Sequence, residues 1–231
     1  MSASDERYMK RVVKGSSGTV FKAVIPPLAG QEPVEPVAIK IMARTAETER
    51  EATIAQLFSG LDHIIPLFSC KMGSNSIELT MPWIPETLLG LMLARKGIPL
   101  SLGRASRFFD QMLAATKIMH SRCFVHKDLK LENILHQDGQ IFLCDFGFSR
   151  SFVRGTTSLC DDLGSLHYAA PELWMAIPYE GPEVDVWALG VCFYLMTTGF
   201  FPFPGDNPEE IFHRIELSAK GLQFPKDTCR S

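Results

Sequence analysis

Three oxygen-bearing side chains near the middle of the chain have the types and spacing that phosphoryl transfer requires. Asp128 and Asn133 lie in a charged segment without apolar periodicity, and Asp145 follows Asn133 by twelve residues. Between them, two short apolar runs flank Asp138-Gly139, a pair that favours a tight β-hairpin. Because a hairpin returns the chain to its start, we expect Asp145 to lie near Asn133 and Asp128.

Each of these side chains has a chemical use. Asn133 and Asp145 can hold a hard cation such as Mg²⁺, which prefers oxygen ligands. Asp128 can accept a proton from an attacking hydroxyl, and Lys130 adds positive charge beside the reacting centre. Asp128, Lys130 and Asn133 are therefore the predicted catalytic residues. Taken alone, residues 126–133 could equally form a charged surface loop.

Four ordered motifs make the sequence resemble the eukaryotic protein kinases. His126-Lys127-Asp128 with Asn133 is similar to the catalytic loop, and Asp145-Phe146-Gly147 is similar to the metal-binding motif. Ala170-Pro171-Glu172 resembles the motif that closes the activation segment. Asp185 to Gly190 resembles the start of the central helix of the large lobe. The resemblance implies ATP and Mg²⁺ as cofactors and protein hydroxyls as acceptors.

The resemblance also implies a nucleotide site in the first part of the chain. Val37-Ala38-Ile39-Lys40 is similar to the strand whose Lys binds the α- and β-phosphates. Glu51 is the expected partner of Lys40, with Glu47 and Glu49 as alternatives. Val13 to Val20 corresponds to the glycine-rich loop, although Val13 replaces its first glycine. The predicted cofactor-binding residues are Val13, Gly15, Gly18, Val20, Ala38, Lys40, Glu51, Met81, Ile84 and Asp145.

The segment after the fourth predicted strand resembles the hinge that binds adenine. By the family pattern, Met81 lies behind the adenine pocket and Ile84 offers its N–H to the base. Glu86 is expected either to reach the ribose or to remain outside the nucleotide site.

The elements that must position these residues predict an α+β, two-lobed protein-kinase-like fold. Residues 1–82 form a small β-rich N-lobe and residues 83–231 a larger, mostly helical C-lobe, together one kinase domain. By the resemblance, this C-lobe lacks its last helices, and a partner could cover the surface that they would protect. Strands are expected at 12–13, 20–25, 37–42 and 77–81, and helices at 46–58, 87–95, 102–121, 171–175, 186–196 and 208–219.

The activation segment, Asp145 to Glu172, resembles that of the serine/threonine class. Ser165 is expected to hydrogen-bond Asp128 and Lys130. We hypothesise that Asp161 pairs with Lys127 as a weaker substitute for a phosphate contact, the alternative being a solvated acid. Three hydroxyl residues are candidate phosphorylation sites: Thr156, Thr157 and Ser158.

Composition limits the other classes of function. Lys and Arg number 23 and Asp and Glu 26, a net charge of −3, which argues against a nucleic-acid-coating protein. The six cysteines form no Cys-x-x-Cys pair, as expected for free thiols inside the cell, in the cytoplasm or nucleus. Residues 186–205 lack charge, but Gly199, Pro202 and Pro204 favour a buried helix and loop over a membrane span.

The activity that the motifs favour is that of a serine/threonine protein kinase, and two alternatives remain open. One is a pseudokinase, an ATP-binding scaffold with little or no transfer activity, suggested by Val13 and the short C-lobe. The other is a small-molecule kinase on a related fold, although such enzymes rarely show the Ala-Pro-Glu motif at 170–172. The branch that looks most similar is that of the calmodulin-dependent or AMP-activated kinases.

Overall fold

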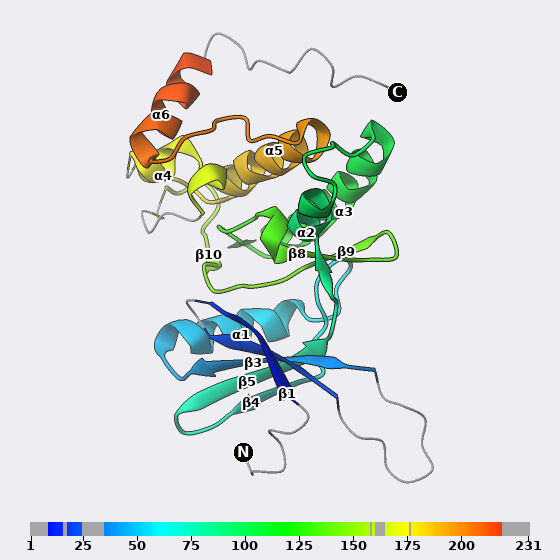
Figure 1. Ribbon diagram of the computed structural model, residues 1–231. Coiled ribbons are helices and arrows are strands. Elements are labelled where there is room, and N and C mark those ends of the chain that lie inside the picture. Colours follow the sequence, from blue (N-terminus) through cyan, green and yellow to red (C-terminus); the bar gives the residue numbers. More distant parts are fainter. Residues whose placement is uncertain are drawn as a thin grey trace. The chain divides into compact units, whose positions relative to one another are not determined.

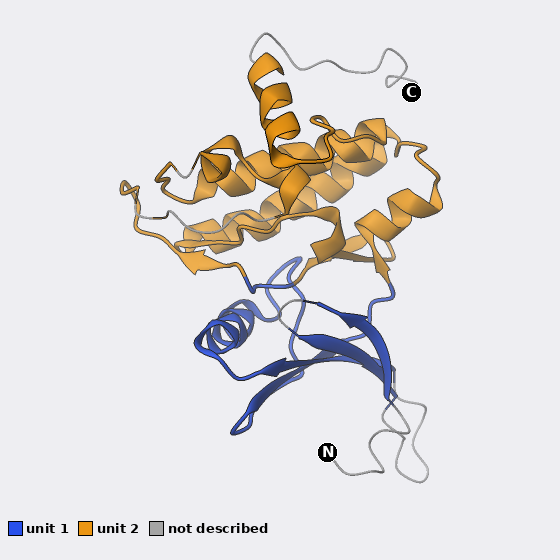
Figure 2. Cartoon of the chain, turned by 60° about the vertical axis from the view of Figure 1, so that its left-hand side comes forward, with its two compact units in different colours: residues 1–85, 145–147 blue, residues 86–144, 148–231 orange. Residues whose placement is uncertain are grey.

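The chain divides into a strand-rich unit and a helix-rich unit (Figure 2), and each is described by itself. The computed structural model describes residues 9–15, 18–24, 35–157, 159, 165–175 and 177–218. Unit 1 comprises residues 1–85 and 145–147, and unit 2 comprises residues 86–144 and 148–231. This composition confirms the α+β class, with a β-rich N-terminal part and a mostly helical C-terminal part.

Unit 1 contains one antiparallel sheet of five strands in the order β1-β2-β3-β5-β4 (Figure 1). The strands are β1 (Met9–Lys14), β2 (Thr19–Ala23), β3 (Val37–Ala43), β4 (Ser69–Met72) and β5 (Ser76–Pro82). The sequence analysis missed β4, because Ser-Cys-Lys-Met contains no β-branched or aromatic residue. Its pairing with β5 from Ser69↔Thr80 to Met72↔Ile77 supplies the missing stabilisation. Strand β3 lies between β2 and β5 and pairs with both, which fixes the position of Lys40.

Helix α1 (Ala46–Phe58) has the predicted bounds, and local chemistry explains where it begins. Thr45 and Thr48 form a reciprocal capping box, in which each side chain accepts from the other residue's backbone N–H. The buried face includes Glu51, Ile54 and Phe58, and the helix contacts β5. A carboxylate on the buried face of a helix requires a partner, and Glu51 has one.

Unit 2 is built around two long helices, α3 and α5, which are in contact and lie side by side in Figure 1. The predicted stripe of Phe108, Met112, Ala115 and Met119 on α3 is buried. Helix α5 begins at Pro182 rather than at Val186. Proline is favoured in the first turn of a helix, where its missing N–H would have no partner in any case. The charged first turn, which includes Asp185, therefore belongs to the helix. The helices are α2 (Leu88–Ala94), α3 (Leu102–Ser121), α4 (Pro171–Trp174), α5 (Pro182–Thr198) and α6 (Pro208–Leu217).

Two small sheets in unit 2 lie around residues 126–133, the predicted catalytic segment. Strands β6 (Glu86–Thr87), β8 (Ile134–Gln137) and β9 (Gln140–Leu143) form one, and β7 (Phe124–Val125) pairs with β10 (Arg150–Ser151) in the other. The predicted β8–β9 hairpin is confirmed. Its turn residues, Asp138 and Gly139, have φ of 51° and 79°, as a type I′ turn requires.

No helix in the described part of the chain is both long enough and apolar enough to cross a membrane. The uncharged run from 186 is divided between α5 and the loop after it, as expected. Four cysteines fall within the described ranges, and all four are free thiols: Cys70, Cys123, Cys144 and Cys192.

The end of α5 gives a first prediction. Gly199 has φ of 81°, and a Cβ there would lie 2.3 Å from the carbonyl oxygen of Gly97. Left-handed backbone costs a non-glycine residue roughly 1–2 kcal/mol, and the clash adds to this. We expect Gly199→Ala to lower the free energy of unfolding by at least about 2 kcal/mol, or the Tm by roughly 4–8 °C, in thermal or urea unfolding.

Gly190→Ala is the matched control, because Gly190 lies inside the same helix and a Cβ added there would meet no atom within 4 Å. We expect this variant to be stabilised by roughly 0.5–1 kcal/mol, since alanine restricts the unfolded chain. Equal unfolding free energies for the two variants would contradict the role given to Gly199.

Candidate active site

Unit 1 holds a cluster of one ammonium and two carboxylates, in which Lys40 and Glu51 are buried and the Asp145 side chain is 41% exposed. Lys40, at the centre of β3, donates to Glu51 Oε1 at 2.5 Å and to Asp145 Oδ1 at 2.9 Å. The Lys40 and Glu51 side chains are 11% and 3% exposed. A charge buried to this extent is stable only when it is paired. The pair of Lys40 and Glu51 therefore holds helix α1 against strand β3.

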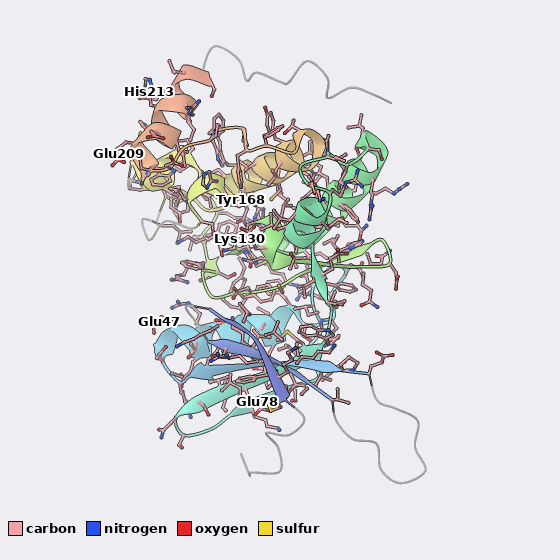
Figure 3. All side chains as sticks on the ribbon, in the orientation of Figure 1. Glu47, Glu78, Lys130, Tyr168, Glu209 and His213 are labelled. Carbon is pink, nitrogen blue, oxygen red and sulfur yellow. The ribbon has the colours of Figure 1, made fainter. Side chains whose placement is uncertain are left out.

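The cluster selects Glu51 among the three candidate partners of Lys40. Glu49 pairs with Arg44 at 2.6 Å instead, on the exposed side of α1. Figure 3 shows Glu47 at the start of the same helix, where its side chain is exposed. Glu51 alone lies on the buried face of α1, because the helical period places it with Ile54 and Phe58.

Burial and charge shift the pKa of both members of the pair. Burial by itself lowers the pKa of Lys40, but the charges of Asp145 and Glu51 and their hydrogen bonds outweigh it and raise the pKa. Burial raises the pKa of Glu51, and the negative charge of Asp145 adds to the rise, which Lys40 only partly offsets. The proton between Lys40 and Glu51 is therefore held more tightly than in the unfolded chain.

Unit 2 holds a second cluster around Asp128. Asp128 Oδ2 contacts Lys130 Nζ at 2.7 Å and accepts from Asn133 Nδ2 at 3.0 Å. Asp128 Oδ1 accepts from Ser165 Oγ at 2.8 Å, and Ser165 Oγ accepts from Lys130 Nζ at 2.7 Å. Asp128 is thus fixed at both oxygens, with Lys130 and Ser165 in the predicted places; Figure 3 labels Lys130 within unit 2.

The amide of Asn133 has a defined orientation. Its Nδ2 donates to the carbonyl oxygen of Asp128 at 2.9 Å as well as to the carboxylate. Because a carbonyl oxygen can only accept, the nitrogen must face Asp128, and the amide oxygen of Asn133 is the atom that can bind a cation. Cys144 N donates to the carbonyl oxygen of Asn133 at 3.0 Å, which ties the segment before Asp145 to this residue.

A carboxylate on α5 holds the backbone of the catalytic segment. Asp185 has no exposed surface, and its two oxygens accept from the backbone N–H groups of His126 and Lys127 at 2.9 and 2.8 Å. His120 Nε2 lies 2.8 Å from Asp185 Oδ2. The sequence analysis missed His120, and it treated Asp185 only as part of a motif. The sequence did contain a signal for a buried role of Asp185, because this acid directly precedes the uncharged residues 186–205.

Two functional segments contain backbone that is unusual for residues other than glycine. Lys127 has φ of 67° and Asp145 has φ of 66°. Such conformations cost of order 1–3 kcal/mol each and persist where the surrounding structure enforces them. For Lys127 the enforcing contacts include the hydrogen bond of its N–H to Asp185.

The glycine-rich segment is fixed by contact with β3. Gly15 N donates to Gly18 O at 2.8 Å, and a Cβ on Gly18 would lie 2.6 Å from Ile41 O. A side chain at position 18 would therefore clash with β3, whether or not Gly18 also contacts phosphate. Val13 pairs with Val20 across β1 and β2 and is exposed, so it is compatible with the strand. Residues 16–17 lie outside the described ranges.

The predicted hinge follows β5 within unit 1. Met81 pairs with Ala38 across β5 and β3, which brings two predicted adenine-site residues together. Trp83 N donates to Pro36 O at 3.2 Å, whereas no hydrogen bond of the Ile84 N–H occurs among the described residues. The predicted hydrogen bond from the Ile84 N–H to adenine stays a prediction.

A magnesium ion that is bound together with a nucleotide needs few protein ligands. Within the described ranges, no three His, Cys, Asp or Glu side chains come close enough to form a metal site of their own. Mg²⁺ commonly takes only one or two protein ligands and completes its shell with phosphate oxygens and water. Asn133 belongs to unit 2 and Asp145 to unit 1, so their binding of one ion together stays a prediction.

Some residues of the predicted activation segment lie outside the part of the chain that the structure describes. Ser158 and Asp161 lie outside the described residues, so the pairing of Asp161 with Lys127 stays a prediction. Lys127 is buried, and its Nζ lies 5.9 Å from the centre of the Tyr179 ring. An aromatic face stabilises a cation at this distance.

The raised pKa of Glu51 gives a prediction of pH dependence. The folded chain binds this proton more tightly than the unfolded chain, so its contribution to stability is complete below the ordinary value of 4.5 and is lost as pH rises through the folded value. The free energy of unfolding of the wild type should therefore fall, relative to that of Glu51→Gln, as pH rises from about 4.5 towards neutrality.

Urea unfolding at a series of pH values measures this difference. Glu49→Gln is the control for removal of a carboxylate from the same helix, since Glu49 lies on its exposed side and pairs with Arg44. A constant difference for Glu51→Gln would contradict the assignment of a raised pKa.

The comparisons with known proteins identify the family of the chain. The family model described as "Protein kinase domain" matches residues 7–227. The chain is 36% identical over 225 residues to "Probable serine/threonine-protein kinase KIN1 homolog" of Enterocytozoon bieneusi, covering 94% of this chain and 36% of that protein. It is 38% identical over 194 residues to "Probable serine/threonine-protein kinase MARK-A" of Dictyostelium discoideum, covering 79% and 18%.

A third relative is "Serine/threonine-protein kinase ppk25" of Schizosaccharomyces pombe, 35% identical over 239 residues, with 95% of this chain and 53% of that protein covered. The chain thus spans at most about half the length of these relatives. The family resemblance is confirmed, whereas the branch within the family stays a prediction. The chain belongs to the protein kinase family, and its relatives are of the serine/threonine class.

Proposed function

We propose that this chain transfers the γ-phosphoryl group of MgATP to serine and threonine hydroxyls of proteins. The observation that carries the proposal is the position of Asp128, whose carboxylate is bound by Lys130, Asn133 and Ser165 in a chain of this family. A carboxylate fixed in this way can accept the proton of an incoming hydroxyl without first reorganising.

Each charged cluster has a separate task in this proposal. MgATP, when bound, supplies the transferable phosphoryl group and the divalent charge that offsets the phosphates. Lys40, held by Glu51, would bind phosphate oxygens, and Asn133 and Asp145 would offer oxygens to Mg²⁺. Asp128 would orient the acceptor hydroxyl, and Lys130 would stabilise negative charge on the transferred group.

The nucleotide pocket is proposed from the same set of residues as the sequence indicated. Val13, Gly15, Gly18 and Val20 would cover the phosphates, and Ala38, Met81 and Ile84 would surround the adenine. The proposed acceptor is the hydroxyl of a protein, because the relatives are named protein kinases. An intracellular place of action is supported by the four free thiols.

The alternative of a pseudokinase has no observation in its favour. Lys40, Asp128 and Asp145 are all present, and each is engaged in hydrogen bonds that its proposed task requires. Val13, which suggested a degenerate site, pairs with Val20 just after a register shift in β1 between Arg11 and Val13.

Removal of the proposed base gives a direct test. We expect Asp128→Asn to lower kcat by about 10²–10⁴-fold, because the amide cannot accept the proton. The measurement is transfer of radiolabelled phosphate from ATP to a generic protein substrate by the purified full chain. Transfer by Asp128→Asn at the wild-type rate would contradict the proposal.

Asp138→Asn is the matched control for this test. Asp138 undergoes the same chemical change, is exposed, and has the positive φ that asparagine also tolerates. Its kcat and its melting temperature should equal those of the wild type.

Metal removal gives a second test that does not depend on transfer. At 100 times its Kd, MgATP should stabilise the chain by about 2.7 kcal/mol through binding to the folded state. The shift in Tm should become much smaller with EDTA, and Asp145→Asn should require a higher Mg²⁺ concentration to restore it. An equal shift with and without Mg²⁺ would contradict the metal ligands proposed here.

A further inference from the structure

The two long helices of unit 2, α3 and α5, reach solvent along one side of their contact. They run antiparallel, since His120 of α3 contacts Asp185 near the start of α5 at 2.8 Å, whereas Phe109 contacts Phe193 further along α5. The centres of these two rings are 4.7 Å apart, and both side chains are half-buried. The ring pair therefore marks the line along which the two helices face solvent.

Apolar side chains of both helices surround this ring pair. On α3, Leu102 and Leu113 are 65% and 41% exposed, and the helical period places them on the same side as Phe109. On α5, Val186 is 61% exposed and lies two helical turns before Phe193, on the same side of that helix. These residues form what we call the α3–α5 face: Leu102, Phe109, Leu113, Val186 and Phe193.

An exposed side without charge is unusual for a helix at a protein surface. Such a helix normally carries charged residues on its solvent side, whereas a helix that is apolar all round is buried. Helix α5 is uncharged from Val186 to Thr198, yet Val186 is exposed. Contiguous exposed apolar residues are typical of interaction sites, so we expect the α3–α5 face to be covered by another surface.

Two charges on α3 beside this face indicate what covers it. Asp110 and Lys117 are exposed, and neither has an ion pair or hydrogen bond within the described ranges. Because they are two turns apart, they lie on one row of the helix at a separation of roughly 10 Å, with Leu113 between them. Opposite charges on either side of one residue match a second copy of the same helix that runs in the opposite direction.

We propose that the α3–α5 face binds a second copy of this chain, with the two α3 helices antiparallel about a twofold axis near Leu113. Asp110 then faces the partner's Lys117, and by symmetry Lys117 faces the partner's Asp110. The apolar residues supply the buried area, and the two ion pairs fix orientation and register. The inference is independent of the proposed function, because the contact uses none of the proposed catalytic residues.

Sedimentation equilibrium of the purified full chain over about 1–100 μM tests the proposal. The wild type should form dimers within this range. Asp110→Lys and Lys117→Glu each turn two attractive contacts into two repulsive ones, so each should weaken the dimer about tenfold or more. The double variant Asp110→Lys/Lys117→Glu should regain the wild-type dissociation constant to within about threefold, because both charges are reversed together.

An equimolar mixture of the two single variants tests the symmetry of the contact. In a mixed dimer, the two lysine side chains of Asp110→Lys would face the two acidic side chains of Lys117→Glu, so both contacts are attractive. The mixture should therefore form dimers at concentrations at which each variant alone is monomeric.

Val186→Lys tests the apolar part of the face. Its ammonium would lose solvent on dimerisation, so the dimer should weaken about tenfold or more. Since Val186 is exposed, the Tm at a concentration at which the wild type is monomeric should equal that of the wild type. Asp62→Lys, which reverses an exposed charge in unit 1, is the control and should dimerise as the wild type does.

Three results would overturn the inference. A wild type that stays monomeric throughout would leave the α3–α5 face to residues 219–231 or to a different protein. Unchanged dimers in Asp110→Lys, Lys117→Glu and Val186→Lys would assign dimerisation to another surface. Failure of both the double variant and the mixture to restore the dimer would contradict the antiparallel pairing of the α3 helices.

Discussion

A single buried carboxylate organises the catalytic segment. Asp185 has no exposed surface and accepts hydrogen bonds from two consecutive backbone N–H groups, those of His126 and Lys127, while His120 contacts it from α3. Loss of this acceptor would leave two buried donors unsatisfied. The same bonds hold Lys127 at its positive φ, and Asp128 is the next residue along the chain. The position of the proposed base therefore depends on α5, an element that contributes no side chain to the chemistry proposed.

Each unit contains one charged cluster whose members are fixed by elements of that unit. In unit 1, the strand β3 and the helix α1 bring Lys40 and Glu51 together, and Asp145 completes the set. In unit 2, Asp128 is bound by Lys130, Asn133 and Ser165. The buried charges of both clusters are paired, as a buried charge requires. Residues 145–147 group with unit 1, although the chain on either side of them belongs to unit 2.

Motif residues in this chain serve packing as well as chemistry. Gly18 belongs to a phosphate-binding pattern, yet the nearness of Ile41 O already excludes a side chain there. The reverse holds for Asp110 and Lys117, which no motif includes but which the proposed contact between two copies of the chain requires. A residue's presence in a family pattern therefore does not by itself separate a structural role from a functional one.

The sequence by itself determined the features that short-range interactions control. Asp138-Gly139 sets the turn of the β8–β9 hairpin, Thr45 caps α1, and the period of apolar residues defines the buried face of α3. The order of the motifs identified the family for the same reason, because each motif is a contiguous stretch. Only the tertiary structure decided which of three nearby acids pairs with Lys40, and that β4 forms at all.

The pairings of Asp185 with His120 and of Glu86 with His136 likewise required the tertiary structure. These partners are 65 and 50 residues apart in the chain, and each pair meets only because two separate elements pack or pair together. Local pattern carries no information about such distant neighbours, since burial and hydrogen bonding between elements are properties of the folded chain.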